Sequence, residues 1–264
     1  GDYIIRIDGH AEISKDFLNS CLNKLMTIDA YCVGGPTRHI ASDLIGKTIA
    51  IAQSSKFGVG TVQFRQGIKQ GIYVDTLAFG AYKREVFEII GGYDIELVRN
   101  QDDEFNFRMI QNNLKIWLDP SIRSYYHPKN SIYKLFKQYF QYGFYKIRVF
   151  QKRGNYASIR HIIPLIFVIC IIYSIYQYIF INSSLPITVL SSSYTITLSL
   201  FTILELIKSN NRYSILLLPI CYLTMHIAYG MGSLLGLFYF INKWNDKNVK
   251  DKYFDRVKFE KNTL

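Results

Sequence analysis

The stretch "IIRIDGHAEI", residues 4–13, decides how the first half of the chain is interpreted. Its first four residues, Ile-Ile-Arg-Ile, are typical of a largely buried β-strand. Gly9 then permits a close turn or the close approach of a ligand. If the extended geometry continues, Asp8 and His10 lie on one face, because side chains alternate along a strand. A carboxylate beside an imidazole can ligate a metal ion, and a turn in which Asp8 bonds its own backbone is the alternative.

The composition indicates a protein that works at a membrane. The 264 residues carry a formal net charge of +11, and 49% of them are hydrophobic. Basic chains often bind nucleic acid, but these basic residues lie beside apolar runs, which favours an anionic membrane surface instead. Four widely spaced cysteines form no metal-binding CxxC pair, and they are interpreted as small core or membrane residues in a reducing compartment.

Three apolar stretches lie in the second half of the chain. Residues 162–181 contain no charge and are long enough to cross a bilayer as a helix. Residues 215–241 are also uncharged and carry Gly232 and Gly236 at a spacing that permits close helix contact. Residues 185–207 are weaker, because serines, threonines and one acid dilute them. The pattern predicts two or three membrane helices, with a buried soluble bundle as the alternative.

Charge predicts which side of the membrane the first half occupies. Residues 129–160 contain eight lysines and arginines and no acid, which indicates the cytoplasmic side. The lysine-rich tail would lie outside after three crossings and inside after two, so the number of crossings stays open. The predicted organisation is a domain over residues 1–150, a membrane region over 151–241 and a basic tail over 242–264.

Residues 1–150 are predicted to form a mixed α/β domain. The expected elements are a strand over residues 4–7, a helix over 14–25 capped by Ser14, a short strand and turn over 31–40, a strand over 74–81, helices over 83–90 and 101–112, and a strand over 115–118. The glycine-rich stretch "SSKFGVGTVQFRQG", residues 54–67, is expected to be a mobile loop.

A second chemical cluster lies in "NQDDEFNFRM", residues 100–109. Asp102, Asp103 and Glu104 begin a predicted helix, where negative charge complements the exposed N–H groups, and this alone explains one or two of them. Three adjacent acids also repel one another, which raises the pKa of at least one if it is partly buried. A carboxylate of this kind can serve as a general base. Arg108, one turn along, can offset the charge.

Taken in order, these features resemble a family 2 glycosyltransferase of the GT-A fold, most like the membrane-bound bacterial enzymes of the succinoglycan-biosynthesis type. The resemblance is carried by "RIDGHAEI", "FGVG", "FGAYKREVFEIIGGYDIELVRNQDDEFNFRM" and "QYFQYGFYK". It covers residues 1–150, and the membrane part matches only in kind. It implies the C-terminal portion of a Rossmann-like GT-A domain followed by transmembrane helices. The nucleotide-binding βα units would precede this sequence, so the fragment is expected to be inactive alone.

The resemblance also implies a metal site. Asp8 and His10 occupy the family's Asp-x-Asp position, with His10 in place of the second Asp. They would hold Mn²⁺ or Mg²⁺ on the diphosphate of a nucleotide sugar. His127 is a further candidate ligand, with a surface loop residue as the alternative.

A base and an acceptor side are implied as well. Asp102 matches the Asp of the family's Glu-Asp motif, the base that deprotonates the acceptor hydroxyl, and because Gln101 replaces the Glu, Asp103 is the other candidate. Gly91, Gly92 and Asp94 match a turn on the acceptor side. Gln138 and Tyr142 lie where relatives carry Gln-x-x-Arg-Trp, although the Arg-Trp pair is absent. Arg108 completes the candidate substrate-binding residues.

The implied activity is inverting transfer of a sugar from a nucleotide-diphosphate sugar to a lipid-linked saccharide in bacterial exopolysaccharide or capsule synthesis. The expected location is the bacterial cytoplasmic (inner) membrane, with several membrane passes and the catalytic domain on the cytoplasmic face. Three alternatives stay open. They are a transferase that acts on polyprenyl phosphate itself, a metal-dependent hydrolase, and a non-catalytic membrane-anchored binding domain.

Overall fold

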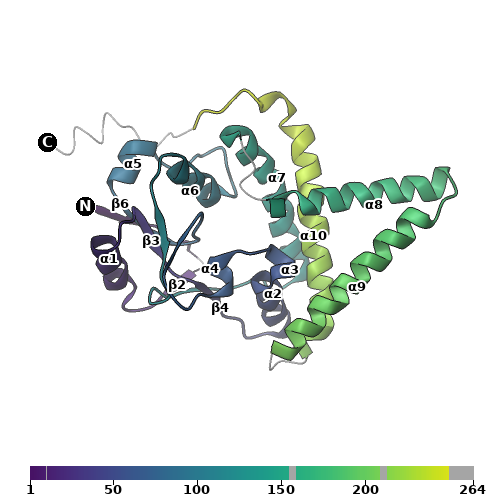
Figure 1. The fold of residues 1–264 in the computed structure, drawn as a ribbon, viewed down its shortest axis with the longest axis horizontal. Coiled ribbons are helices and arrows are strands. Elements are labelled where there is room, and N and C mark those ends of the chain that lie inside the picture. Colours follow the sequence, from purple (N-terminus) through teal and green to yellow (C-terminus); the bar gives the residue numbers. More distant parts are fainter. Residues whose placement is uncertain (10, 155–158, 209–212, 250–264) are drawn as a thin grey trace.

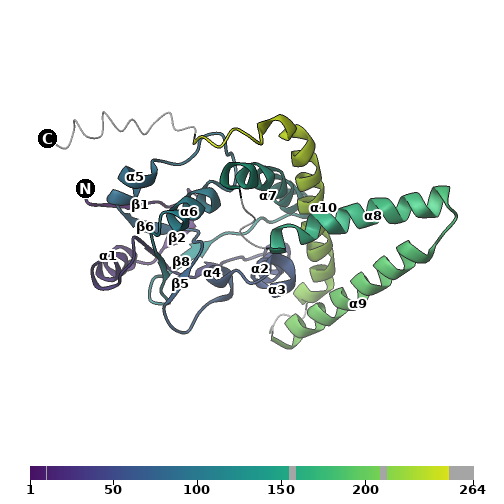
Figure 2. The same ribbon diagram turned by 45° about the horizontal axis from the view of Figure 1, so that its top comes forward.

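The computed structural model describes residues 1–9, 11–154, 159–208 and 213–249 (Figure 1). An α/β body contains the first part of the chain, and long helices lie along one side of it. Helices α8 (Ile163–Phe180) and α9 (Leu185–Lys208) project away from the body in both views (Figures 1 and 2). This is the mixed α/β domain followed by apolar helices that the sequence predicts.

Two small sheets form the body. The strands are β1 (Tyr3–Ile5), β2 (Ala11–Ile13), β3 (Cys32–Gly34), β4 (Thr37–His39), β5 (Ile72–Val74), β6 (Gly80–Lys83), β7 (Ile116–Leu118) and β8 (Ser124–Tyr126). One sheet has the order β1-β6-β3-β7-β5 and the other β2-β8-β4. β3 and β7 are parallel, whereas β6 is antiparallel to β1 and β3. Asp8 lies in the connection from β1 to β2, which joins the two sheets.

Helices cover both faces of the five-stranded sheet. Those of the body are α1 (Phe17–Thr27), α2 (Leu44–Ser54), α3 (Lys56–Val59), α4 (Gln63–Gln66), α5 (Glu85–Ile90) and α6 (Gln101–Gln111). Side chains alternate across β3, so that Cys32 joins a core with α5 and α6, and Val33 joins a core with α1. Phe105 and Met109 are fully buried in the first core. Their burial fixes α6, and with it the acidic first turn, against the sheet.

Two further long helices, α7 (Ile132–Arg153) and α10 (Tyr213–Tyr239), pack side by side and share an apolar core with α2. Glycine brings their backbones together. A Cβ added at Gly143 of α7 would lie 2.0 Å from the carbonyl oxygen of Tyr229, and one added at Gly232 of α10 would lie 2.0 Å from that of Phe140. Gly232 therefore makes the close helix contact that its spacing predicts, and its partner is α7.

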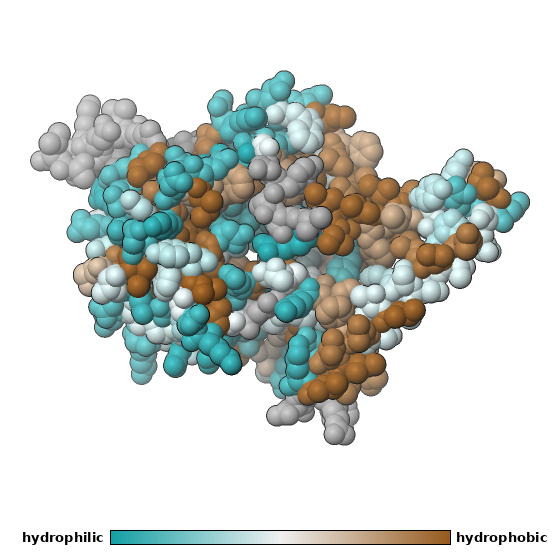
Figure 3. Space-filling view, viewed as in Figure 1, coloured by the Kyte–Doolittle hydropathy of each residue, from teal (hydrophilic) through white to brown (hydrophobic). Residues whose placement is uncertain are grey.

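Three helices are long and apolar enough to cross a membrane, over Ile163–Phe180, Leu185–Lys208 and Leu216–Tyr239. They coincide with the three predicted apolar stretches. Their surroundings differ, because 44% of the apolar window of α10 is buried in the protein, against 11% for α8 and none for α9. Figure 3 shows hydrophobic residues gathered over the exposed parts of these helices.

Several body elements differ from the prediction. α1 begins at Phe17 with Asp16 at its N-cap, so Ser14 is not the cap. The strand predicted over residues 74–81 is replaced by the ends of two strands, β5 and β6, with a turn between them. The predicted mobile loop contains α3 and α4, and α3 is capped by Ser55, whose hydroxyl accepts from the N–H of Gly58 at 3.1 Å. By contrast, α6 and β7 begin or end within one residue of their predicted bounds.

Candidate active site

Asp8 and Asp102 line one cavity of about 90 Å³ in the body, called here the inner cavity. Asp8 comes from the connection after β1, and Asp102 comes from the first turn of α6. The Arg6 guanidinium donates to Asp8 at 3.2 Å, stacks over the ring of Tyr93, and lies close enough to Asp102 for its charge to act on that carboxylate. The structure thus brings together two residues to which the sequence assigns the metal and the base.

The three adjacent acids of α6 have different surroundings. Burial raises the pKa of Asp102, and the charge of Asp103 adds to this rise. Burial acts on Asp103 in the same direction, but its ion pair with Lys146 of α7 helps to bring its pKa below the ordinary value. Glu104 is fully buried and pairs with Arg108 at 2.8 Å. The pKa of Asp102 is therefore raised, whereas Asp103 and Glu104 form ion pairs with cations.

The first turn of α6 is fastened to α7 on both sides of Asp102. Asn100, the N-cap residue, has a left-handed backbone with φ of 62°, and its Nδ2 donates to the carbonyl oxygen of Tyr142 at 2.8 Å. One turn further along α7, Lys146 pairs with Asp103. These two contacts hold the backbone on either side of Asp102, so the position of its carboxylate depends on α7.

A second cavity of about 540 Å³, the membrane-side cavity, lies between the body and the long helices. Asp102 belongs to its wall, together with Phe167 of α8 and Tyr194 of α9. Four residues line both cavities: Phe64, Arg65, Asp102 and Tyr142. Asp102 therefore faces Asp8 on one side and a space among apolar helices on the other.

Arg65 is a cation of this site that the sequence analysis did not single out. It lies in α4 and lines both cavities. Asp102 and nearby tyrosines act on its charge, but no carboxylate of the described residues forms an ion pair with it. A guanidinium with free donors beside a cavity is suited to bind phosphate. The sequence signal was the arginine within the glycine-rich stretch over residues 54–67, which was predicted to be a mobile loop.

Comparison with known proteins shows which sequences this chain is similar to. No family model matches the chain. It is 30% identical over 169 residues to the succinoglycan biosynthesis protein ExoA of Rhizobium meliloti (strain 1021), which covers 62% of this chain and 49% of that protein. It is 26% identical over 246 residues to the dolichyl N-acetyl-α-D-glucosaminyl phosphate 3-β-D-2,3-diacetamido-2,3-dideoxy-β-D-glucuronosyltransferase of Methanococcus voltae, which covers 90% of this chain and 71% of that protein. These two matches support the interpretation of the chain as a family 2 glycosyltransferase. The chain spans about half of the length of the first relative.

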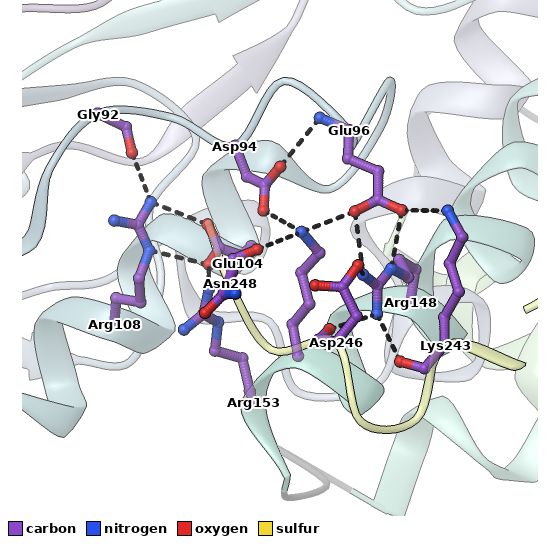
Figure 4. Close-up of polar contacts among 11 residues, drawn as sticks. Gly92, Asp94, Glu96, Glu104, Arg108, Arg148, Arg153, Lys243, Asp246 and Asn248 are labelled. Carbon is purple, nitrogen blue, oxygen red and sulfur yellow. Dashed lines mark hydrogen bonds and ion pairs between the residues drawn. The ribbon is translucent and has the colours of Figure 1, made fainter. Parts of the chain in front are cut away.

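The glycine turn expected on the acceptor side does not line either cavity. Arg108 fastens the turn, because its guanidinium donates to the carbonyl oxygen of Gly92 at 2.6 Å (Figure 4). It also donates to the carbonyl oxygen of Ile90, next to Gly91. Asp94 is fully buried and pairs with Lys152 of α7 (Figure 4). The residues that line the two cavities include neither these glycines nor Asp94 and Arg108. Here they connect α5, α6 and α7.

The two residues at the position of the family's Gln-x-x-Arg-Trp motif do reach the inner cavity. Gln138 is buried, and its Nε2 donates to the hydroxyl of Tyr126 at 3.2 Å and to that of Tyr142 at 2.8 Å. Gln138 and Tyr142 line the cavity that also holds Asp8 and Asp102. Their hydroxyl and amide groups give its wall hydrogen-bonding capacity suited to a sugar.

Of the candidate metal ligands, Asp8 lines the inner cavity and His127 does not. Asp8 is 35% exposed and faces the inner cavity. His127 lies outside both cavities, where its Nε2 is 2.7 Å from Glu12, and His10 lies outside the described residues. Over the described ranges no cluster of three metal-ligating side chains occurs. A single carboxylate at a cavity still fits Mg²⁺ or Mn²⁺, because such ions are commonly held by one or two carboxylates together with substrate phosphates and water.

Proposed function

We propose that this chain carries the metal-binding and acceptor-binding half of an inverting glycosyltransferase. The enzyme would move a sugar from a nucleotide-diphosphate sugar to a lipid-linked saccharide in bacterial exopolysaccharide or capsule synthesis. The observation that carries the proposal is the position of Asp102 in the wall between two cavities. Asp8 lines one of them, and apolar helices line the other.

Asp102 is the proposed general base. Its carboxylate takes the proton of the acceptor hydroxyl while that oxygen bonds to the anomeric carbon of the donor sugar. The bond from this carbon to the diphosphate oxygen breaks, and its electron pair leaves with the nucleoside diphosphate. Attack opposite the leaving group inverts the anomeric configuration. The raised pKa of Asp102 supports this role, because it makes the carboxylate a stronger base than an ordinary one.

Asp8 and Arg65 are the proposed partners of the diphosphate. Asp8, with His10 as the second expected ligand, would hold Mn²⁺ or Mg²⁺, which stabilises negative charge on the departing nucleoside diphosphate. Arg65 would bind phosphate oxygens through its free donors. Arg65 and Asp102 line the same two cavities, which places this cation near the proposed reacting groups.

The membrane-side cavity supports a lipid-linked acceptor. Its wall combines apolar and aromatic residues of the long helices, such as Phe167 and Phe201, with the cations Lys56 and Arg160. The lipid chain would lie against the first group and its phosphates near the second. The name of the M. voltae relative also contains a dolichyl sugar phosphate, which is a saccharide on a lipid phosphate. The basic segment before α8 supports a location at the cytoplasmic face of a bacterial inner membrane.

The proposal is tested by sugar transfer in membranes that contain the full-length protein. Radiolabelled nucleotide sugars are added with Mn²⁺ or with a chelator, and label is counted in the lipid fraction. We expect one donor to label lipid only with the metal, and Asp102→Asn to abolish labelling. Asp29→Asn, at an exposed carboxylate paired with Lys115, is the matched control. Unchanged labelling in Asp102→Asn would contradict the proposal. Labelling of added polyprenyl phosphate would instead favour that simpler acceptor.

A further inference from the structure

We infer that only α8 and α9 cross the membrane, as one hairpin, and that α10 lies along the membrane surface. By length and composition α10 is a third candidate span. Its contacts assign it a different place, with one face on the catalytic body and the other on lipid. The segment that follows α10 then stays on the same side as the body. This arrangement does not depend on which reaction the protein catalyses.

Both ends of α10 are bonded to the body. Near its start, Leu218 is fully buried in the same core as Ile49 of α2, and one turn further along the hydroxyl of Tyr222 donates to that of Ser55 at 2.7 Å. Just beyond its end, the carbonyl oxygen of Phe240 accepts a hydrogen bond from Gln151 of α7 at 2.8 Å. A helix whose two ends both touch one soluble body cannot place them on opposite sides of a bilayer.

The residues after α10 are held by a buried ionic cluster (Figure 4). Arg148 of α7 is fully buried, and its guanidinium donates to Glu96 at 3.0 Å and to Asp246 at 2.9 Å. Lys243 pairs with the same Glu96 at 2.7 Å. Lys152, also fully buried, donates to the carbonyl oxygen of Asn248 at 2.9 Å. This part of the chain therefore belongs to the catalytic side.

Helix α7 limits how deep α10 can lie. The two helices touch along their length, from the core that Leu135 shares with Tyr222 to the hydrogen bond of Gln151 with Phe240. α7 carries six basic residues, and charged side chains in the hydrocarbon core are costly. They are Lys134, Lys137, Lys146, Arg148, Lys152 and Arg153. Since α7 stays outside the hydrocarbon, its neighbour α10 lies no deeper than the interface.

The outward face of α10 is apolar along its whole length. Besides Tyr239 at the helix end, six exposed large side chains recur every three to eight residues and form one stripe on the helix. They are Leu216, Ile220, Leu223, Met231, Leu235 and Phe238. α10 itself carries no charged residue, so this outward stripe is suited to contact with lipid while the opposite face packs on α7 and α2. Trp244, which follows α10 and is 47% exposed, is the residue type that favours this depth.

The hairpin of α8 and α9 leaves the body and returns to it. At its start, the carbonyl oxygen of Pro164 would lie 2.2 Å from a Cβ added at Gly230 of α10. At its end, Lys208 lines a cavity together with Arg38 and Arg123 of the body. The 18 residues of α8 extend about 27 Å, close to the ~30 Å of a bilayer core. α10 runs across the direction in which the hairpin projects (Figures 1 and 2), so a hairpin that crosses the membrane leaves α10 along its surface.

Cysteine labelling in sealed vesicles of each orientation tests the inference. Ser184→Cys in the hairpin connection, Asn245→Cys after α10 and Lys69→Cys in the body are made singly in the full-length protein, at positions that are exposed. A membrane-impermeant maleimide is applied, and labelling after detergent defines the total. The unsubstituted protein gives the background of the native cysteines.

We expect Asn245→Cys and Lys69→Cys to react in the same vesicle orientation, and Ser184→Cys in the opposite one. Reaction of Asn245→Cys together with Ser184→Cys would show that α10 crosses, and reaction of Ser184→Cys together with Lys69→Cys would show that the hairpin does not. Lipid contact is tested with a fluorophore on Leu235→Cys, which interfacial spin-labelled lipids should quench. Absence of quenching would overturn lipid contact and leave a second copy or another protein on the stripe.

Discussion

Asp8 and Asp102 line the same cavity, although one follows the first strand and the other begins the sixth helix. Two connecting segments of the α/β body therefore supply one site. Ligands of open α/β sheets commonly bind at such ends of strands and helices. The distinct chemistry of the two carboxylates leads to separate predictions: both are half-buried, but desolvation raises the pKa of Asp102.

Asp8→Asn is expected to weaken binding of the metal ion and to leave the general base unchanged. Loss of a charged ligand should raise the Mn²⁺ concentration needed for half-maximal transfer by at least about 10-fold, since changes to metal-site residues commonly cost 10- to 100-fold. The measurement is a metal titration of the transfer rate in membranes. An unchanged titration curve, equal to that of the control Asp29→Asn, would remove Asp8 from the metal site.

The pH dependence of transfer distinguishes Asp102 from Asp103 as the base. A base works when deprotonated, so transfer should fall as the pH drops through the pKa of Asp102, which burial raises from its ordinary value. Asp103→Asn removes a negative neighbour that adds to this rise, so the acid limb should move to lower pH with most activity retained. If Asp103→Asn instead abolishes transfer at every pH, Asp103 is the base.

Arg65→Ala is expected to weaken binding of the phosphate-bearing substrates. A hydrogen bond to a charged group contributes about 2 kcal/mol, which corresponds to about 30-fold in KM. Arg65→Lys keeps the charge but loses the fork of donors, so it should recover part of this loss. Arg123→Ala is the matched control, because that exposed arginine lines neither the inner nor the membrane-side cavity. Equal KM values for all three variants would exclude Arg65 from the site.

Arg148→Met is expected to destabilise the protein and to release the segment after α10. The change removes the hydrogen bonds of Arg148 to Glu96 and Asp246, while Lys152 and Lys243 still pair with Glu96, so we expect a loss of about 1.5–3 kcal/mol. Thermal unfolding in detergent, compared with Arg38→Met at an exposed arginine of β4, measures the loss. A midpoint equal to that of the control would mean that the ionic cluster contributes little to stability.

The sequence predicted the elements whose pattern is local. α6 follows from an acidic first turn and a regular apolar spacing, and the three apolar helices follow from length and lack of charge. α7 was recognised only as a basic segment, because its apolar residues are interrupted by buried cations such as Arg148 and Lys152. Those cations are stable there only through partners from elsewhere in the chain, Glu96 and Asp246 among them, and a linear sequence does not show such pairs.

The sequence predicted part of the candidate site. The resemblance gave Asp8, Asp102, Gln138 and Tyr142, all of which line the inner cavity. Arg65 was missed because a lone arginine in a glycine-rich stretch has no pattern of its own. Its importance depends on how α4 lies against the start of α6, which tertiary packing determines. The different surroundings of Asp102 and Asp103 likewise depend on tertiary packing, because Lys146 of α7 pairs with Asp103.

The most direct test of the account measures donor binding and sugar transfer in one variant, Asp102→Asn of the full-length protein. Calorimetry with a nucleoside diphosphate and Mn²⁺ reports the site around Asp8, and single-turnover labelling of lipid reports the chemical step. We predict binding within about twofold of the unsubstituted protein and transfer reduced by about 10²–10⁴-fold, the usual contribution of a general base. Transfer that continues at an undiminished rate in this variant would contradict the account.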